Sequence, residues 1–244
     1  PLLRWMRKVR SLLTTAGLNE VVTLPFCSPK LNRAFPGLWG NDGQPVKITN
    51  PLRQDTDEMR LSLLPGLTDS LHYHTERRDE SLMIFELNKV FTLRGDNTYT
   101  ERVNIAGLIH GRRSRHGLKI RSRDFAFADI KGILEDLLEG TGLTNTRWVA
   151  EDPPPTLHPE QFAAVFSEST HLGYVGELSP RVSKQLDLPP CFLFELDFDA
   201  IVQYARPGFR IRPMPRFPSI ERDLAIIVSK NFPSQLAIDW VKGL

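Results

Sequence analysis

The chain has 244 residues, of which 41% are hydrophobic and 25% are charged. This composition is typical of a globular protein and excludes a collagen-like or disordered chain, and no apolar run approaches the roughly 20 residues that a membrane-spanning helix needs. The 31 Lys and Arg residues against 29 Asp and Glu residues leave a net charge of +2, which excludes a strongly basic nucleic-acid binder. Any RNA contact must therefore be local.

The number of cysteines indicates the redox environment of the protein. Cys27 and Cys191 are too few for a disulfide framework, and no Cys/His cluster has the spacing of metal ligands. The sequence therefore predicts a reducing, cytoplasmic location and no metal site. Because the chain starts at Pro1 without an initiator Met and stops inside a predicted helix, we expect a fragment of a longer protein.

The N-terminal third predicts two helices separated by a strand and loops. Apolar residues recur at helical spacing over residues 2–16, and residues 20–24 have strand character. Turn-forming pairs fill residues 35–56. A second helix is expected to start at Pro65, because proline is tolerated in the first helical turn. Its apolar seam is formed by Leu64, Leu67 and Leu71.

The middle of the chain alternates strands with two further helices. The segments with strand composition are residues 82–93, 103–110, 162–167, 172–178 and 192–198. Gly95-Asp96-Asn97 supplies a turn between the first two. The clearest helix spans residues 129–139, and a short helix over residues 179–186 starts with Ser179 as its N-cap. Because the strands lack regular βαβ spacing, we predict an α+β fold with an antiparallel sheet.

The C-terminal segment predicts a linker and the start of another domain. Four prolines within residues 207–218 indicate an extended linker. One strand over residues 223–228 and one helix over residues 234–242 follow. A single strand and a single helix cannot close a core, so we expect residues 219–244 to open an incomplete domain.

Six sequence motifs occur in one order along the chain. They are Asn50-Pro51-Leu52, the stretch from Met59 to Leu67, the stretch from Phe85 to Phe91, Asp124-Phe125 with the stretch from Asp129 to Gly132, the stretch from Gly176 to Val182, and Arg216-Phe217-Pro218 with the stretch from Arg222 to Ala225. As an ordered set they resemble the β-subunit family of bacterial phenylalanyl-tRNA synthetase.

The resemblance implies a fold and a function. Residues 1–206 would form a class II aminoacyl-tRNA synthetase-like antiparallel sheet with flanking helices, catalytic-like but not catalytic. Residues 219–244 would begin a ferredoxin-fold anticodon-binding domain. The whole enzyme would use ATP and Mg²⁺ to attach phenylalanine to tRNA(Phe). This segment would scaffold the α subunit, in a heterotetramer of two α and two β subunits, and support tRNA binding.

The residues themselves argue against chemistry in this segment. Amino-acid activation requires arginines that converge on phosphate. Arg94 and Arg102 flank the loop that resembles the second class II motif, but the loop lacks the pattern of an active member. In the stretch compared with the third motif, Glu177 and Pro180 stand where a catalytic copy has small residues. We therefore predict no catalytic residue, and no cofactor held by this segment.

A subunit interface and an RNA contact are the candidate sites. The helix that starts at Pro65 resembles the class II interface element, so the predicted interface is Leu64, Pro65, Leu67 and Leu71; the same spacing also suits a plain core helix. Residues 110–123 hold the densest positive charge, and phosphate contacts need such side chains. The candidate RNA-contact residues are Arg112, Arg113, Arg115, Lys119 and Arg121. The alternative is a solvated loop before the next helix.

Two rival functions remain open at this point. One is a free-standing, synthetase-derived module that binds an amino acid or RNA without a partner subunit. It predicts an open reading frame with ends near Pro1 and Leu244. The other is an active synthetase, which predicts ATP–pyrophosphate exchange by this chain alone.

Overall fold

The computed structural model describes residues 2–38, 43–51, 53–96, 98–113, 122–206, 222–229, 232 and 234–242. The chain divides into two units, Pro1–Phe209 and Arg210–Leu244. The predicted linker over residues 207–218 lies outside the described residues.

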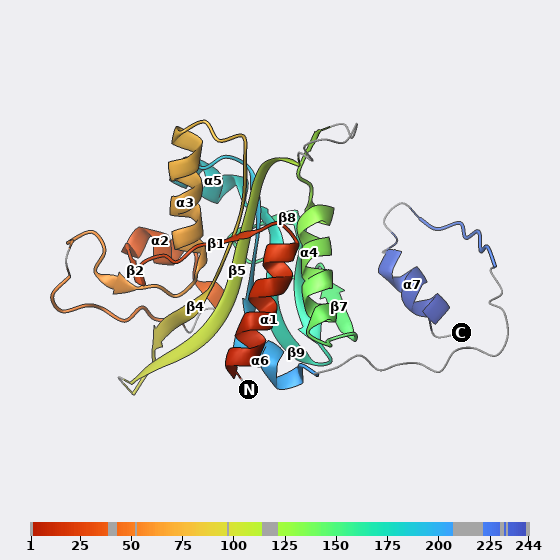
Figure 1. Ribbon diagram of the computed structural model, residues 1–244, viewed down its shortest axis with the longest axis horizontal. Coiled ribbons are helices and arrows are strands. Elements are labelled where there is room, and N and C mark those ends of the chain that lie inside the picture. Colours follow the sequence, from red (N-terminus) through yellow and green to blue (C-terminus); the bar gives the residue numbers. More distant parts are fainter. Residues whose placement is uncertain are drawn as a thin grey trace. The chain divides into compact units, whose positions relative to one another are not determined.

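The first unit is built on one large sheet (Figure 1). Its strands lie in the order β1-β4-β5-β10-β9-β8-β7, and β6 pairs with β5. β1 is parallel to β4, and all other neighbours are antiparallel. The bounds are β1 Asn19–Glu20, β4 Ser81–Leu93, β5 Tyr99–Arg113, β6 Arg123–Asp124, β7 Thr146–Val149, β8 Leu157–Ser167, β9 Thr170–Leu178 and β10 Cys191–Asp197.

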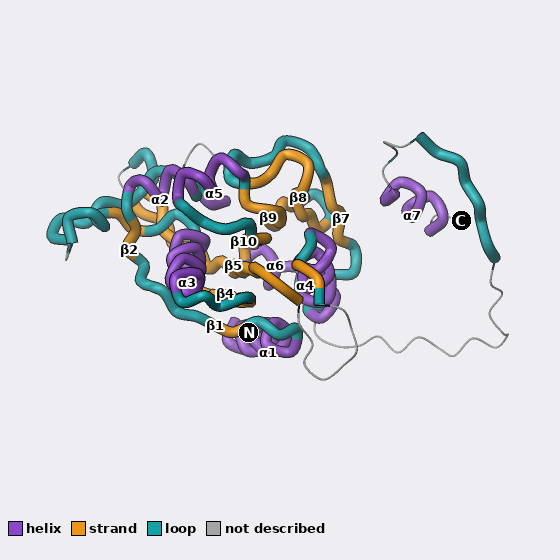
Figure 2. The backbone as a smooth tube through the Cα atoms, turned by 90° about the horizontal axis from the view of Figure 1, so that it is seen from above, coloured by secondary structure: helices purple, strands orange, loops and turns teal. Residues whose placement is uncertain are grey.

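Helices cover both faces of this sheet (Figure 2). One face packs against α1, α4 and α6, and the other against α2, α3 and α5. A separate pair of short strands, β2 and β3, lies outside the sheet. The bounds are α1 Leu2–Thr15, β2 Phe26–Cys27, α2 Pro29–Ala34, β3 Glu58–Met59, α3 Leu64–Glu76, α4 Phe127–Gly140, α5 Pro180–Leu186 and α6 Phe198–Tyr204.

The predicted α+β architecture is confirmed in the first unit. The four helices predicted there form close to their expected bounds, and the five strands predicted within residues 82–198 all form. β5 and β8 are longer than predicted, since β5 extends at both ends and β8 starts at Leu157 instead of Phe162. β4 and β5 pair as a long hairpin. Helix α4 starts two residues earlier than predicted, at Phe127. Asp129 explains this, because its carboxylate accepts a hydrogen bond from the Ala126 backbone N–H at 2.9 Å and satisfies a donor that the first turn leaves free.

The strand predicted over residues 20–24 is too long. Only β1 and the Val21 N–H, which donates to Phe85 O at 2.9 Å, pair with β4. Thr23 then turns its backbone N–H to a side-chain carboxylate of Glu86 instead of continuing the ladder. Val22 and Leu24 are left 81% and 75% exposed.

In the second unit one prediction is confirmed and one is wrong. Helix α7, Ser234–Lys242, forms as predicted. Residues 222–229 form no strand, because none of them pairs with another strand in the described part of the chain. A segment with high strand propensity forms a strand only when a neighbouring strand pairs with its backbone N–H and C=O groups. The ferredoxin-like domain therefore stays a prediction.

Phe194 tests how strongly the central strand depends on packing. Its ring is fully buried on β10 and lies so close to Gly107 of β5 that a Cβ there would sit 2.4 Å from it. We expect Phe194→Ala to lower the free energy of unfolding by about 3–5 kcal/mol, measured by urea denaturation. Tyr99→Ala removes a ring that is 65% exposed and should cost less than about 1 kcal/mol. Equal losses would contradict this packing.

Candidate functional site

The segment from Glu58 to Leu63 leads from β3 into α3 and is bound to the rest of the chain almost residue by residue. The Asn32 side chain donates to Glu58 Oε2 at 2.9 Å and to Met59 O at 3.0 Å, and its own oxygen accepts from Leu61 N at 3.0 Å. Asn32 lies in the short helix α2, which is capped by Ser28. The segment therefore has one fixed path across the edge of the sheet.

Glu195 is the first of two buried carboxylates that hold this segment. It projects from β10 and is 3% exposed. Its Oε2 accepts from Ser62 Oγ at 2.5 Å, and its Oε1 accepts from Leu63 N at 3.0 Å and from Asn104 Nδ2 at 2.8 Å. Burial raises the pKa of Glu195, and the hydrogen bonds and the charge of Arg60 act in the opposite sense. Both oxygens of the Glu195 carboxyl group therefore accept hydrogen bonds from within the chain.

Glu86 on β4 is the second buried carboxylate. Arg60 Nη1 lies 3.0 Å from Glu86 Oε1, with both side chains at most 2% exposed. Thr23 Oγ1 donates to Glu86 Oε2 at 2.6 Å, and Arg60 Nε donates to Lys89 O at 3.0 Å. A buried ion pair of this kind fixes geometry, since removal of either partner leaves an uncompensated charge.

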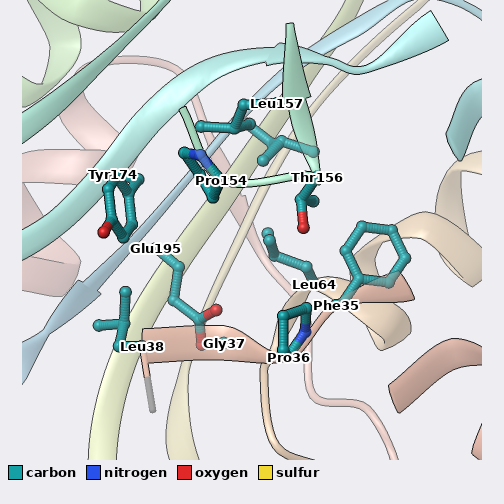
Figure 3. A pocket seen from close by; sticks show the side chains of 11 residues that line it. Phe35, Pro36, Gly37, Leu38, Leu64, Pro154, Thr156, Leu157, Tyr174 and Glu195 are labelled. Atoms are coloured by element: carbon teal, nitrogen blue, oxygen red, sulfur yellow. The ribbon is translucent and has the colours of Figure 1, made fainter. Parts of the chain in front are cut away.

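A small pocket opens beside Glu195 (Figure 3). Its volume is about 40 Å³, enough for one or two water molecules. The lining residues are Phe35, Pro36, Gly37, Leu38, Leu64, Pro154, Thr156, Leu157, Tyr174, Leu193 and Glu195. None of these described residues is a cation, so the pocket offers no positive charge to a phosphate group.

The two arginines of the β4–β5 hairpin are engaged elsewhere. Arg94 Nε donates to Thr100 Oγ1 at 2.5 Å across the hairpin, and Arg102 Nη1 lies 3.8 Å from Asp197 Oδ2. Neither lines the pocket. They stabilise the hairpin and its junction with β10.

The glycines compared with the third class II motif serve strand packing. Gly173 has φ +150°, and a Cβ there would lie 2.1 Å from Glu195 O. At Gly176 a Cβ would lie 2.7 Å from Gln161 O. Both positions let β9 approach its neighbours closely, so the missing side chains leave no open space for a ligand.

The residues predicted as a subunit interface lie inside the chain. Leu64, Pro65, Leu67 and Leu71 are buried on α3 and face the sheet, with Leu67 and Leu71 fully covered. They are core residues in this structure, as the alternative interpretation of their spacing allowed. The exposed side chains of α3 are Asp69, His72, Tyr73, Thr75 and Glu76.

The structure describes two of the five predicted RNA-contact residues. Arg113 Nη1 lies 2.8 Å from Asp129 Oδ1, and Arg112 Nε lies 3.7 Å from Asp124 Oδ1. Both arginines are therefore partly neutralised by neighbouring carboxylates. Arg115, Lys119 and Arg121 lie outside the described residues.

Both cysteines are buried free thiols, and burial raises the pKa of each to about 12. They are therefore protonated and poorly nucleophilic. Among the described residues no three His, Cys, Asp or Glu side chains are placed to hold a metal ion. None of the helices in that part of the chain combines the length and hydropathy that a membrane span requires.

Sequence reasoning missed the buried polar network, although some of its members lie in the quoted motifs. Arg60 and Ser62 fall in one of them, and Glu86 falls in another. Charged residues inside apolar strand segments were the signal, because a buried charge requires a partner.

The comparisons with known proteins identify the family. Residues 1–198 match the family described as "Phenylalanyl tRNA synthetase beta chain CLM domain". The chain belongs to this family. Curated phenylalanine–tRNA ligase β subunits are similar over almost the whole chain: that of Moorella thermoacetica is 37% identical over 96% of the chain, and that of Carboxydothermus hydrogenoformans is 33% identical over 97%.

This β-chain segment is shorter than its relatives. It spans 29% of the Moorella protein and 30% of the Carboxydothermus protein. In fold, it is similar to the crystal structure of pyrrolysyl-tRNA synthetase from Desulfitobacterium hafniense, with a TM-score of 0.62 and 14% identity over 83% of this chain and 68% of that one. The predicted synthetase-like fold of the first unit is thereby confirmed.

The raised pKa of Glu195 makes a pH-dependent prediction. The folded chain keeps this proton to higher pH than the unfolded chain, so wild-type stability falls as pH rises above the ordinary pKa of 4.5. Glu195→Gln removes that loss. We expect the stability of Glu195→Gln relative to wild type to increase as the pH rises above 4.5 in urea denaturation.

The exposed Glu151→Gln variant is the matched control and should show no such trend. Glu195→Ala should instead lose about 3 kcal/mol or more at every pH, since three buried donors lose their acceptor. A flat difference between Glu195→Gln and wild type would contradict the assignment.

Proposed function

We propose that this chain is the non-catalytic, synthetase-like core of a phenylalanyl-tRNA synthetase β subunit. In this proposal the whole cytoplasmic enzyme uses ATP and Mg²⁺ to ligate phenylalanine to tRNA(Phe). The segment scaffolds the α subunit in a heterotetramer of two α and two β subunits. Residues 219–244 begin a ferredoxin-fold anticodon-binding domain.

The observation that carries the proposal is that the chain's own groups occupy the space beside Glu195 on β10. A chain that activates an amino acid needs an open pocket with cations for the phosphates. Here the oxygens of Glu195 accept hydrogen bonds from Ser62, Leu63 and Asn104. The pocket that remains beside Glu195 has a volume of about 40 Å³. Such an arrangement favours a structural role over catalysis.

A surface for the α subunit is suggested by the segment after β1. In the described part of the sheet β1 is an edge strand, and the chain continues past it with Val22, Leu24 and Phe26 exposed by 81%, 75% and 38%. Alternating exposed apolar side chains beside a free strand edge are typical of a surface that a partner covers. Thr23, which lies between Val22 and Leu24, is held from within, because its hydroxyl donates to Glu86 and Glu86 pairs with Arg60.

Association with the α subunit tests the scaffold role. On size-exclusion chromatography with light scattering, we expect the wild-type chain to co-elute with the α subunit. The double variant Val22→Asp/Leu24→Asp should bind at least about tenfold more weakly, because each substitution desolvates a charge against an apolar partner surface.

Ile227→Asp is the matched control, since it places the same charge at a fully exposed apolar position of the second unit. It should co-elute as wild type does. A wild-type chain that ignores the α subunit, or ATP–pyrophosphate exchange by the chain alone, would refute the proposal. The first result would favour the free-standing binding module and the second an active synthetase.

The tRNA contact is proposed for Arg112, Arg113, Arg115, Lys119 and Arg121. Each phosphate contact releases counterions and steepens the dependence of binding on salt. We expect the triple variant Arg115→Gln/Lys119→Gln/Arg121→Gln to make binding of tRNA(Phe) less dependent on salt. The magnitude of the slope of log K against log salt should fall by about 2–3, measured by fluorescence anisotropy with the assembled enzyme.

The control removes three other exposed cations, in Arg33→Gln/Arg147→Gln/Lys184→Gln. It should change the slope by less than about 1, as expected for long-range charge alone. An unchanged slope in the first triple variant would mean that this segment is a solvated loop.

A further inference from the structure

Residues 21–27 alternate between bound and exposed positions as the chain passes the edge of the sheet. The side chains of Val22, Leu24 and Phe26 are 81%, 75% and 38% exposed, and together they form an apolar ridge. The odd-numbered residues between them are bound to the rest of the first unit. Such an alternation is typical of an extended chain that is held on one side only.

The odd-numbered residues are each bound to a different group. The contacts, with the donor first in each hydrogen bond, are Val21 N to Phe85 O at 2.9 Å, Thr23 N to Glu86 Oε1 at 3.2 Å, Arg60 N to Pro25 O at 2.9 Å, and the pairing of Cys27 with Glu58 between β2 and β3. These groups belong to β4 and to the segment that leads into α3. Residues 21–27 are therefore held between those two elements.

Thr23 makes the most contacts in this segment. Its Oγ1 donates to Glu86 Oε2 at 2.6 Å and accepts from Arg60 Nη1 at 2.9 Å. Its side chain also lies against Gly66 in α3, where an added Cβ would sit 2.1 Å from Thr23 Oγ1. Because only glycine leaves this space, Gly66 lets the segment approach the helix closely.

The groups that hold Thr23 are hidden from any partner that covers the ridge. Arg60 is 2% exposed and Glu86 is 1% exposed. A partner protein that covers Val22 and Leu24 cannot contact these two buried side chains. Any effect that they have on association must therefore act through the position of residues 21–27.

We infer that Thr23 and Gly66, together with the buried ion pair that binds Thr23, are positioning residues for the docking of the α subunit. They hold the apolar ridge in the conformation that the partner binds. The inference rests on the proposed scaffold role and assigns part of that role to groups that the partner does not touch. A ridge that is fixed before binding loses less conformational entropy on association than a loose one.

Gly66→Ala tests this role without a change at the ridge. The new methyl group pushes against Thr23, while alanine favours the helical conformation of α3. We expect the substitution to weaken association with the α subunit at least about fivefold in isothermal titration calorimetry. Gly132→Ala is the matched control in helix α4, because a Cβ there would contact no neighbouring segment within 4 Å. Its Kd should stay within about twofold of wild type.

Thr23→Val provides a second variant. It keeps the branched shape of the side chain and removes the hydroxyl, and it should weaken association by a similar factor. Thr68→Val is its control, because the Thr68 hydroxyl donates to Leu64 O and Pro65 O within α3 and does not contact residues 21–27. Its affinity should be unchanged. Equal losses in the two threonine variants would indicate general destabilisation and would overturn the inference.

A combined variant separates positioning from a direct contact. Added to Val22→Asp/Leu24→Asp, the substitution Gly66→Ala should cause no further loss of affinity, because the ridge no longer contributes to binding. Two effects that share one surface are not additive. Fully additive losses would overturn the inference.

Amide hydrogen exchange in the chain alone distinguishes a failure of this inference from a failure of the scaffold role. The Arg60 N–H is bonded to Pro25 O and so reports whether the segment is held. Its exchange should accelerate at least about tenfold in Gly66→Ala and stay unchanged in Gly132→Ala. Unchanged exchange in Gly66→Ala, or unchanged affinity of this variant for the α subunit, would refute the positioning role alone. No association of the wild-type chain would refute the scaffold role itself.

Discussion

Two buried carboxylates determine how the rest of the first unit is arranged. Glu86 on β4 and Glu195 on β10 lie on two strands that flank β5, and both reach the segment that leads into α3. Because each oxygen is already bonded, this segment has one position relative to the sheet. Leaving one partner of the Arg60–Glu86 pair without the other costs about 3–5 kcal/mol. Positions of the segment that would separate the two side chains are therefore strongly disfavoured.

The same constraint separates architecture from chemistry. In this β-chain segment a synthetase-like sheet is kept intact while the space beside Glu195 is occupied by the chain's own groups. Ser62, Leu63 and Asn104 direct their donors at Glu195, which leaves little space beside it. Polar groups that would orient a ligand in an active site here orient a helix.

Local patterns predicted most of the elements, because periodicity and turn chemistry act over a few residues. The seam at Leu64 and Leu67 indicated a buried face, and Gly95-Asp96 indicated the hairpin. The Ser28-Pro29 pair also signalled the start of α2 and was overlooked. The candidate site was beyond such reasoning, because Ser62 and Glu195 lie 133 residues apart. For the same reason the end of β1 was misplaced: the partner that draws Thr23 away is Glu86, 63 residues later.

The position of β10 has a consequence for the order of folding. It pairs with β5 and β9 at the centre of the sheet, although it is the last strand of the first unit to leave the ribosome. During synthesis β4 and β5 can form their hairpin early, but the other edge of β5 stays open for more than 70 residues of further elongation. Because β10 pairs with a strand that is distant in sequence, its contacts with β5 have a large sequence separation, and such contacts slow folding. The nascent chain therefore carries an unpaired, apolar edge until β10 has been synthesised, and that interval is when aggregation competes with folding.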